Sequence, residues 1–219
     1  MNISMRIKQI AACVKYDTVC DIGTDHGYLL IYLANEKSLK HGAACDVNSG
    51  PLGCASRNVE AAKMSAVIET RLGYGLSPVL QGEFECCVVA GMGGMLILEI
   101  LSADLLKAKS FEQLVLSPHR ECDSVRRFLH ASGMRITDEH LIFDAGKWYN
   151  IIDCRVGNEA AYNEAGYLFG QRLIKRQDIL LKEFLEREIE KTQKLLTLSN
   201  KSVKTKDYHE KCVEAYKWL

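Results

Sequence analysis

The 219-residue sequence lacks an excess of charge of either sign, because 28 lysines and arginines balance 28 aspartates and glutamates. A chain without net charge has no overall attraction for nucleic acid or for an anionic membrane. It also lacks a secretory signal and any apolar run near the roughly 20 residues that a membrane-spanning helix needs. We therefore expect a cytoplasmic protein with no membrane partner.

Metal-ligating and disulfide patterns are also missing, although the chain has nine cysteines. No two cysteines have C-x-x-C spacing, and the count is odd. Buried, reduced thiols behave as small hydrophobic side chains. We predict this role, and no metal site, for the cysteines that lie mostly in apolar runs, which are Cys13, Cys20, Cys45, Cys54, Cys86, Cys87 and Cys154.

What the sequence does contain is an alternation of short apolar runs with amphipathic stretches. This alternation is typical of a parallel sheet with helices on both faces. Two final strands flank Asp144-Ala145-Gly146 and predict an antiparallel hairpin. We predict helices at 5–15, 27–36, 50–63, 94–107 and 121–132, and strands at 17–22, 42–46, 67–72, 84–90, 112–117, 134–143 and 147–156.

The predicted order of elements resembles that of class I, Rossmann-like methyltransferases that use S-adenosylmethionine. It implies an α/β fold with a mostly parallel seven-stranded sheet and an antiparallel last strand. After about residue 160 the strand pattern stops, and leucines recur at helical spacing among many charges. We predict a catalytic domain at 1–160 and a helical hairpin or short coiled coil at 161–219, with a turn at 199–202.

The stretch 19–28, VCDIGTDHGY, predicts a strand that ends in a glycine-rich turn and opens into a helix. Such turns bind ligands at the carboxyl ends of parallel strands. A pyrophosphate site would have a glycine where Asp25 stands, and both Asp21 and Asp25 would repel phosphate. Two carboxylates favour instead a ligand with an ammonium and a sulfonium, as in S-adenosylmethionine. The predicted cofactor-binding residues here are Asp21, Gly23, Thr24, Asp25, His26 and Gly27.

The ends of the next two strands add candidates for the nucleoside part of the cofactor. Asp46 ends the second strand, where an acid accepts hydrogen bonds from ribose hydroxyls or else caps the following helix. The loop RLGYGL at 71–76 would border the adenine. We therefore add Asp46, Val47, Gly73, Tyr74 and Gly75 to the cofactor-binding set.

Three glycines follow the most apolar strand in VVAGMGGML, at 88–96. The N/D-P-P-Y/F motif of many amine methyltransferases is absent, so Ala90, Gly91 and Met92 would line the site with backbone groups, or else form only a tight turn. We predict all three as cofactor-binding residues, and Gly91 and Met92 together with Asp25 as catalytic. Ser117 and His119, at the end of the fifth strand, would face the same crevice, with Arg120 beside them. His119 is a candidate proton acceptor or phosphate contact, or else an ordinary surface residue.

Four stretches in this order, DIGTDHGYL, AGMGGMLI, LSPH and DAGKWYNII, resemble the bacterial tRNA (adenine-N1)-methyltransferase family called TrmK. The resemblance covers essentially the whole chain, including the helical segment that begins LFGQRLIKRQ. It implies S-adenosylmethionine as methyl donor and adenine 22 of the tRNA D-arm as acceptor. The chain departs from the family pattern at Asp46, where glutamate is frequent, at Ser117-Pro118-His119, which replaces Q-P-N, and at Gln171, where proline is common.

For such a reaction we expect direct transfer of the methyl group to adenine N1, which has a free lone pair in an unpaired base. No proton leaves N1, so no strong base is needed. Asp25 or backbone carbonyls near Gly91 would stabilise the cationic product. The base would be flipped out. Candidate stacking surfaces are Tyr28, Tyr74, Met92 and Trp148, and candidate RNA contacts are Arg6, Lys8, Lys15 and the helical tail.

Two alternatives stay open from the sequence. The same cofactor site could serve methylation of a small molecule, or the fold could be kept in a non-catalytic binding module. Lys147, Trp148 and Tyr149 either border the acceptor pocket or are ordinary strand residues. The sequence does not determine the oligomeric state, and a monomer is our expectation.

Overall fold

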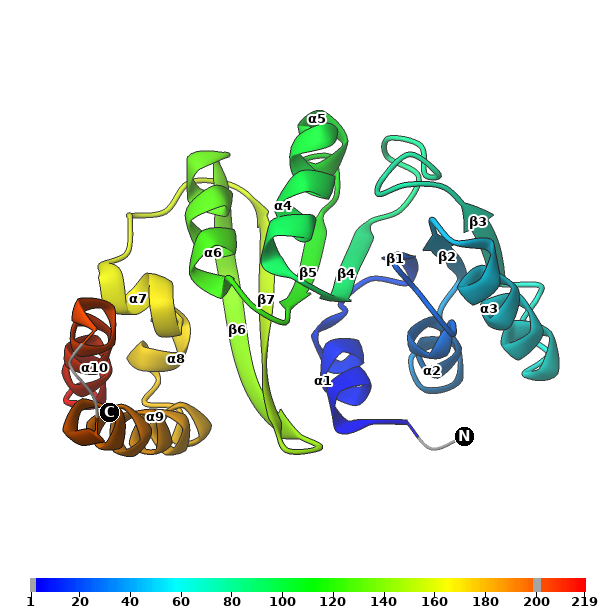
Figure 1. The fold of residues 1–219 in the computed structure, drawn as a ribbon. Coiled ribbons are helices and arrows are strands. Elements are labelled where there is room, and N and C mark those ends of the chain that lie inside the picture. Colours follow the sequence, from blue (N-terminus) through cyan, green and yellow to red (C-terminus); the bar gives the residue numbers. More distant parts are fainter. Residues whose placement is uncertain (1–2, 199–201) are drawn as a thin grey trace.

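A computed structural model describes residues 3–198 and 202–219 and contains one seven-stranded sheet (Figure 1). The strand order is β3-β2-β1-β4-β5-β7-β6. The first five strands pair in parallel, whereas β7 is antiparallel to both β5 and β6. This confirms the predicted fold class. The strands are β1 Thr18–Ile22, β2 His41–Asp46, β3 Ile68–Leu72, β4 Cys86–Met92, β5 Gln113–Pro118, β6 Met134–Asp144 and β7 Lys147–Val156.

Helices cover both faces of the sheet, as the near-continuous apolar runs of its central strands require. One buried cluster joins Val19, Val88 and Val115 of the sheet to α1 Met5–Cys13, α2 Tyr28–Glu36 and α3 Ser49–Ala61. The other cluster joins the opposite strand face to α4 Gly94–Ala103, α5 Leu105–Ala108 and α6 Cys122–Ala131. The two clusters lie on opposite sides because successive side chains of a strand alternate in direction.

Two predicted boundaries, the end of β4 and the end of the helix that follows it, are wrong. Strand β4 continues through Met92, two residues beyond its predicted end, because a register shift at Gly91 lets the strand bend and go on pairing with β5. The predicted helix 94–107 breaks at Asp104, whose side chain accepts a hydrogen bond from the Lys107 amide and starts α5.

The predicted hairpin is confirmed, with Asp144 paired to Lys147 across a two-residue turn. Ala145 and Gly146 both have positive φ, at 48° and 78°. This is the turn whose twist matches that of the flanking strands. The hairpin places β7 between β5 and β6 and reverses its direction relative to β5.

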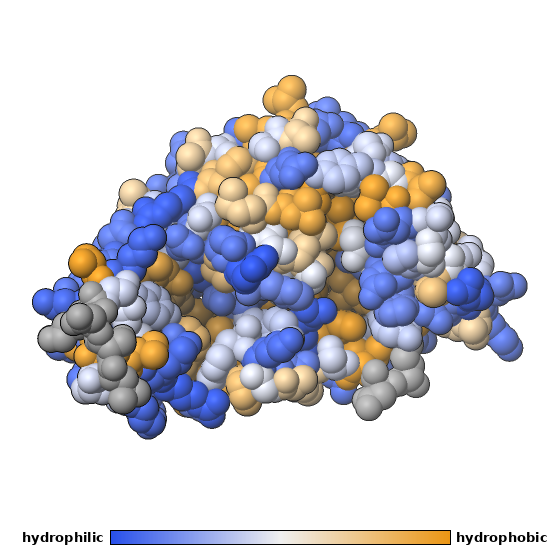
Figure 2. Space-filling model, viewed as in Figure 1, coloured by the Kyte–Doolittle hydropathy of each residue, from blue (hydrophilic) through white to orange (hydrophobic). Residues whose placement is uncertain are grey.

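The tail contains two short helices, α7 Glu164–Phe169 and α8 Gln171–Lys175, before the long pair α9 Ile179–Leu198 and α10 Val203–Tyr216. The prediction of a simple hairpin missed α7 and α8. The second long helix begins at Val203 after Ser202, and residues 199–201 of the predicted turn lie outside the described residues. In Figure 2 the tail side is largely hydrophilic, whereas hydrophobic residues gather around α4. The proposed division at 160/161 falls between β7 and α7 and stays a prediction.

A buried ion pair joins the tail to the sheet domain. Arg126 of α6 donates to Glu139 of β6 over 2.6 Å, and both side chains have no exposed surface. The Arg126 guanidinium also donates to the carbonyls of Tyr167 and Leu168 in α7. Burial of these donors and acceptors is tolerable because they satisfy one another.

All nine cysteines are free thiols, and seven of them are buried. Burial raises the pKa of the Cys13 thiol to about 12, with the charge of Asp153 adding to the effect. Cys54 differs from the prediction, because it lies half-buried on α3, where its Sγ accepts a hydrogen bond from Arg57. Over residues 3–198 and 202–219, no helix has the length and apolarity of a membrane span, and no group of three or more metal-ligating side chains occurs.

Candidate functional site

A pocket of about 270 Å³ opens at the carboxyl ends of β1 and β4, between the first turns of α1 and α2. Strand β1 lies between β2 and β4, so the strand order reverses there. This is where ligands bind in open α/β sheets. The pocket brings together seven of the predicted site residues, which are Asp21, Gly23, Thr24, Asp25, His26, Ala90 and Gly91.

Three residues of the β1–α2 turn have left-handed backbone conformations, with φ of 77° at Gly23, 54° at Asp25 and 71° at Gly27. The amides of Gly23 and Thr24 both donate to the carbonyl of Cys45 in β2, over 2.8 and 3.0 Å. The turn is thereby fixed against the neighbouring strand. A non-glycine residue such as Asp25 rarely adopts positive φ, and such conformations concentrate at functional sites.

Asp21 is a buried carboxylate with 5% of its surface exposed. Its Oδ2 accepts a hydrogen bond from the Thr24 hydroxyl over 2.7 Å. Burial raises the pKa of Asp21 to about 6, and the negative charge of Asp46 adds to this, while the Thr24 hydrogen bond and the charge of Arg6 oppose it. A cationic ligand group in the pocket would therefore stabilise the ionised form of Asp21.

Asp46 is also buried and connects the two turns at this edge of the sheet. Its Oδ1 accepts from the Asn48 amide over 2.9 Å, and its Oδ2 accepts from the Asp25 amide over 3.4 Å. A carboxylate offers about four lone-pair directions. Each oxygen can therefore accept one further hydrogen bond from a ligand hydroxyl.

The end of β4 forms the opposite wall. Gly91 has φ of 83° and stands at the register shift between Ala90 and Met92. The Met92 side chain reaches across to β1, because a Cβ built on Gly23 would lie 2.7 Å from Met92 Cε. Met92 thus packs against the turn at Gly23, and the positive φ of Gly23 disfavours any other residue there.

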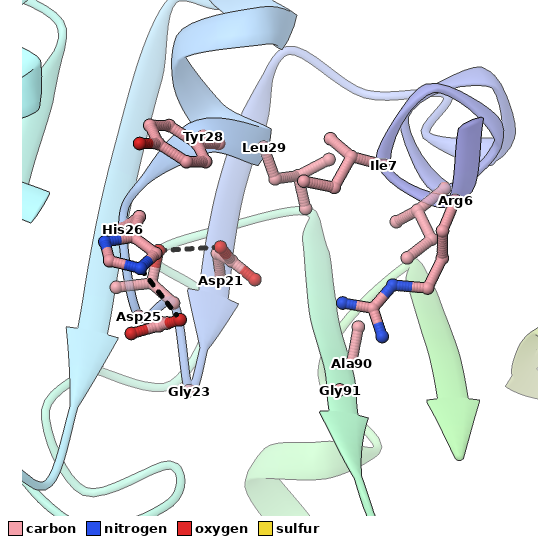
Figure 3. Close-up of a pocket in the computed structure, with 12 residues that line it drawn as sticks. Arg6, Ile7, Asp21, Gly23, Asp25, His26, Tyr28, Leu29, Ala90 and Gly91 are labelled. Atoms are coloured by element: carbon pink, nitrogen blue, oxygen red, sulfur yellow. Dashed lines mark hydrogen bonds and ion pairs between the residues drawn. The ribbon is translucent and has the colours of Figure 1, made fainter. Parts of the chain in front are cut away.

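Arg6 of α1 lies across the pocket from Asp21 and Asp25 (Figure 3). Its Nη1 donates to Nε2 of His119 over 2.7 Å, and its guanidinium carbon lies 5.1 Å from the centre of the Tyr149 ring. The Arg6 amide donates to Oδ2 of Asp144 over 3.1 Å, which ties α1 to the β6–β7 hairpin. The pocket therefore has an acidic side and a basic side.

Comparison with known proteins agrees with this geometry. Residues 3–152 match the family model described as a methyltransferase domain. The chain is 29% identical over 220 residues to the tRNA (adenine(22)-N(1))-methyltransferase of Bacillus subtilis, and the match covers 98% of this chain and 92% of that protein.

Two solved structures extend the comparison. A candidate tRNA (m1A22) methyltransferase of Streptococcus pneumoniae has a TM-score of 0.91 and 29% identity, covering 98% of this chain and 100% of that one. M. capricolum TrmK, solved with S-adenosyl-homocysteine, has a TM-score of 0.86 and 26% identity, covering 99% of each chain. The chain belongs to the TrmK family of methyltransferases.

The pocket fits the donor that TrmK proteins use. Asp21 is an ionisable group without a cationic hydrogen-bond partner among the described residues, and its raised pKa shows that its charge is poorly compensated. Asp46 ends the neighbouring strand β2, and its carboxylate oxygens have lone pairs left for ligand hydroxyls. These are the groups that a sulfonium, an ammonium and a ribose would engage.

Other predicted TrmK site residues lie outside this pocket, and their role stays a prediction. Val47 is exposed. Gly73 donates from its amide to the Asp46 carbonyl, and Gly75 packs against Ile100. The hydroxyl of Tyr74 donates to Glu99 of α4 over 2.5 Å, which fixes the loop after β3 to the next helix.

The predicted orientation of Ser117 is wrong, and Trp148 does not line this pocket. Ser117 is fully buried and its Oγ has no partner within the described chain, because β5 stays covered up to its last residue. Trp148 packs with Phe143 and Phe184, at ring distances of 4.8 and 5.6 Å, and belongs to the contact with the tail. His119, by contrast, reaches the basic wall through Arg6.

The sequence missed the contribution of α1 and of the first turn of α2. Arg6 was predicted to contact RNA together with Lys8 and Lys15, yet it lines the pocket, and Lys15 pairs with buried Asp153 over 2.5 Å. The helical spacing of 5–15 indicated an amphipathic helix but not where it packs. The remaining residues that the cofactor-site prediction missed are Ile7, Ile10, Tyr28 and Leu29.

Proposed function

We propose that this protein methylates N1 of adenine 22 in the D-arm of tRNA, with S-adenosylmethionine as the methyl donor. The observation that carries the proposal is the match to the Bacillus subtilis tRNA (adenine(22)-N(1))-methyltransferase over 98% of this chain. The acidic pocket at the switch point of the sheet supports it, because its charges suit this donor.

In this proposal the β1–α2 turn and the end of β2 hold the donor. Asp21 lies beside its positive charge, and Thr24 fixes the Asp21 carboxylate through the 2.7 Å hydrogen bond. Asp46 accepts hydrogen bonds from the ribose hydroxyls. The complete proposed binding set is Asp21, Gly23, Thr24, Asp25, His26, Gly27, Asp46, Val47, Gly73, Tyr74, Gly75, Ala90, Gly91 and Met92.

Bound S-adenosylmethionine would supply a methyl group activated by a sulfonium. The proposed catalytic residues are Asp25 and Gly91, which line the pocket, and Met92, which follows Gly91 at the end of β4. In this proposal the exposed carboxylate of Asp25, whose Oδ2 lies 3.4 Å from Nε2 of His26, stabilises the positive charge that develops on the adenine ring. Gly91 leaves open space for a flat base, and positioning supplies much of the remaining rate acceleration.

The proposed macromolecular partner is tRNA. We propose neither a membrane partner nor a metal ion for this protein. A tRNA substrate is a cytoplasmic molecule, so we expect the protein to act in the cytoplasm, as a monomer. Residues 1–160 would bind the donor and carry out transfer, and residues 161–219 would add a surface for RNA. Any contact of basic residues with the phosphate backbone would weaken as salt concentration rises.

The direct test is incubation of the purified protein with labelled S-adenosylmethionine and bulk tRNA, followed by nucleoside analysis and mapping of the modified position. We expect 1-methyladenosine at position 22. Label in a different nucleoside or position would refute the proposed specificity. Donor binding without any transfer to RNA would favour methylation of a small molecule, and a protein that binds no donor would be a non-catalytic module.

The role of Asp25 needs its own variants. Asp25→Ala should abolish transfer while the circular dichroism spectrum and the melting temperature stay close to those of the wild type. Asp25→Asn keeps the shape of the side chain and tolerates the left-handed backbone, so it isolates the charge. Full activity of Asp25→Ala would exclude Asp25 from catalysis.

A further inference from the structure

A second pocket, of about 220 Å³, lies between the sheet domain and the tail, where α7 packs on α6 and α9 packs on β6 (Figure 1). We name it the junction pocket. Asp123 and Asn150 line it from the sheet domain, and Phe169, Phe184 and Tyr208 line it from the tail. It is smaller than the roughly 300–1,000 Å³ of most cofactor pockets, so its size suits a single ring system.

The tail side of the junction pocket is aromatic. The ring centre of Phe169 lies 6.5 Å from that of Phe184 and 6.1 Å from that of Tyr208, so the three rings form one surface. Phe184 and Tyr208 are only half-buried, which leaves part of each side chain accessible. Unpaired nucleic-acid bases stack on such rings, and every base has a face that can do so. The aromatic side therefore favours a base without selecting one.

Asn150 offers a hydrogen-bond donor from the sheet side. Its Oδ1 accepts from Nη2 of Arg126 over 3.0 Å, and arginine can only donate, so the amide oxygen must face Arg126. The amide Nδ2 therefore points away from Arg126, and it has no acceptor within residues 3–198 and 202–219. Arg126 is itself fixed by the 2.6 Å ion pair with Glu139, which holds the Asn150 amide in this orientation.

Asp123 offers acceptors from the same side of the pocket. It stands in the first turn of α6, where an acid interacts favourably with the helix dipole. That interaction occupies neither carboxylate oxygen, and in the described part of the chain no cation or N–H group bonds to them. This half-buried carboxylate is therefore left with two oxygens that can accept hydrogen bonds from a ligand.

We propose that the junction pocket binds a guanine base of the tRNA substrate, unpaired and turned out of its stack. The Watson–Crick edge of guanine has two adjacent donors, N1–H and N2–H, beside the acceptor O6. The Asp123 carboxylate accepts from both donors, the Asn150 amide donates to O6, and the aromatic rings stack on the base. Adenine, cytosine and uracil each lack the second adjacent donor. This inference rests on the proposed function, since it takes tRNA as the source of the guanine.

The junction pocket is separate from the donor pocket. Asn150 pairs with Leu141 on the face of the β6–β7 hairpin that the tail covers, whereas Tyr149 pairs with Ile142 on the face that α1 covers. Consecutive side chains of a strand point to opposite faces, so β7 stands between the guanine and the donor. The guanine would anchor the RNA without contacting the reacting atoms. Arg126 is a positioning residue, because it acts through Asn150.

The first test measures mononucleotide binding by tryptophan fluorescence. Trp148 packs on Phe184 at a ring distance of 5.6 Å, so it reports on the junction pocket. The chain has two tryptophans, and Trp218→Phe leaves Trp148 as the single reporter. Guanosine monophosphate should bind this reporter protein about fivefold or more tightly than inosine monophosphate, which lacks only the N2 amine, or adenosine monophosphate. The three ligands share the ribose phosphate, so any contact with that group cancels.

Two further variants of the reporter protein assign the contacts. Asp123→Asn keeps one oxygen, so guanosine monophosphate should bind about tenfold more weakly, and its advantage over inosine monophosphate should nearly vanish. Asn150→Asp still accepts from Arg126 but sets a carboxylate against O6, so both of these ligands should lose affinity equally. Glu36→Gln removes the same charge from an exposed residue at the end of α2. It is the matched control for Asp123 and should bind all three ligands as the reporter protein does.

The second test measures methylation of bulk tRNA. Asp123→Asn should raise the KM for tRNA by about fivefold or more while kcat and the affinity for S-adenosylmethionine stay unchanged, because the anchor contributes equally before and during transfer. Glu36→Gln should have the KM of the wild type. A fall in kcat at unchanged KM would place Asp123 in the reaction itself and would overturn the anchoring role.

The remaining outcomes are also decisive. Equal affinity for the three mononucleotides, or no change of fluorescence with guanosine monophosphate, would overturn the inference. Selective binding of guanosine monophosphate with an unchanged KM for tRNA would assign the pocket to a free guanine nucleotide and would overturn the RNA assignment. A wild-type protein that methylates no tRNA would refute the proposed function, whereas the mononucleotide titration would still decide whether the junction pocket binds guanine.

Discussion

Two buried carboxylates in this molecule have opposite surroundings. Glu139, in the junction between sheet and tail, accepts from the Arg126 guanidinium over 2.6 Å and from the Arg172 amide over 3.0 Å. Asp21, in the pocket, is almost as well buried, but within residues 3–198 and 202–219 it accepts only from the Thr24 hydroxyl. Glu139 therefore has a full positive partner inside the protein, and Asp21 has none in this part of the chain.

This difference distinguishes a charge that holds the structure together from one that awaits a ligand. An unpaired buried carboxylate destabilises the folded state, and its raised pKa records that cost. A protein retains such a group where a bound cation compensates it. The left-handed backbone of Asp25 beside it adds a second unfavourable feature at the same edge of the sheet.

The largest expected effect is the loss of the charge partner at the junction. Arg126→Met leaves Glu139 buried and unpaired and frees the carbonyls of Tyr167 and Leu168, so the free energy of unfolding should fall by about 3–5 kcal/mol. Urea denaturation measures this loss in the free energy of unfolding. The double variant Arg126→Met with Glu139→Leu removes both charges and should be distinctly more stable than the single variant. If the single variant is as stable as the wild type, the junction does not depend on this pair.

The pocket should behave in the opposite way. Asp21→Asn removes a charge that the ligand-free protein stabilises poorly, so the free energy of unfolding should rise by about 1–2 kcal/mol. Asparagine can still accept from Thr24. Binding of S-adenosylmethionine, measured by calorimetry, should weaken by about tenfold or more because the cation loses its counter-charge. Loss of both stability and binding would show that Asp21 has a structural role like that of Glu139.

The pH dependence of the wild type should show the same opposition. The pKa of Asp21 is about 6 in the folded protein, above its ordinary value of 3.8. Between these values the folded state holds more protons than the unfolded state, so the contribution of Asp21 to stability improves as pH falls from 7 towards 4. Affinity for the donor should instead fall, by up to about tenfold per pH unit below 6. In Asp21→Asn, neither the free energy of unfolding nor the donor affinity should show this dependence on pH.

A third carboxylate provides the smallest effect. Asp153 is buried, but its partner Lys15 is mostly exposed to solvent, at 60% of its side chain. Lys15→Gln keeps a hydrogen-bond donor within reach, so the free energy of unfolding should fall by only about 1 kcal/mol. Urea denaturation of both proteins at low and at high salt measures this loss. The wild type should exceed Lys15→Gln in free energy of unfolding by less at high salt, because salt screens the ion pair. A loss as large as that of Arg126→Met would mean that exposure of the cation does not matter here.

Much of the fold could be predicted because it depends on local pattern. The apolar run of β4, the glycine turn after β1 and the Ala145-Gly146 turn each encode their structure over a few residues. The positions of Asp21, Gly23, Thr24, Asp25 and Gly91 at one pocket follow from the rule that carboxyl ends of parallel strands share an edge. The break at Asp104 and the extension of β4 to Met92 were missed because each depends on a single side-chain cap or a bulge.

The sequence by itself determined the α/β architecture, the order of its strands along the chain and the acidic character of the donor turn, because periodicity and turn chemistry act locally. Only the tertiary structure decided that α1 turns Arg6 into the pocket, that Trp148 faces the tail and that Arg126 meets Glu139. Those contacts join residues far apart in the chain. They depend on how whole helices pack on the sheet, and an amphipathic pattern reveals which helix face is buried but not the partner that buries it.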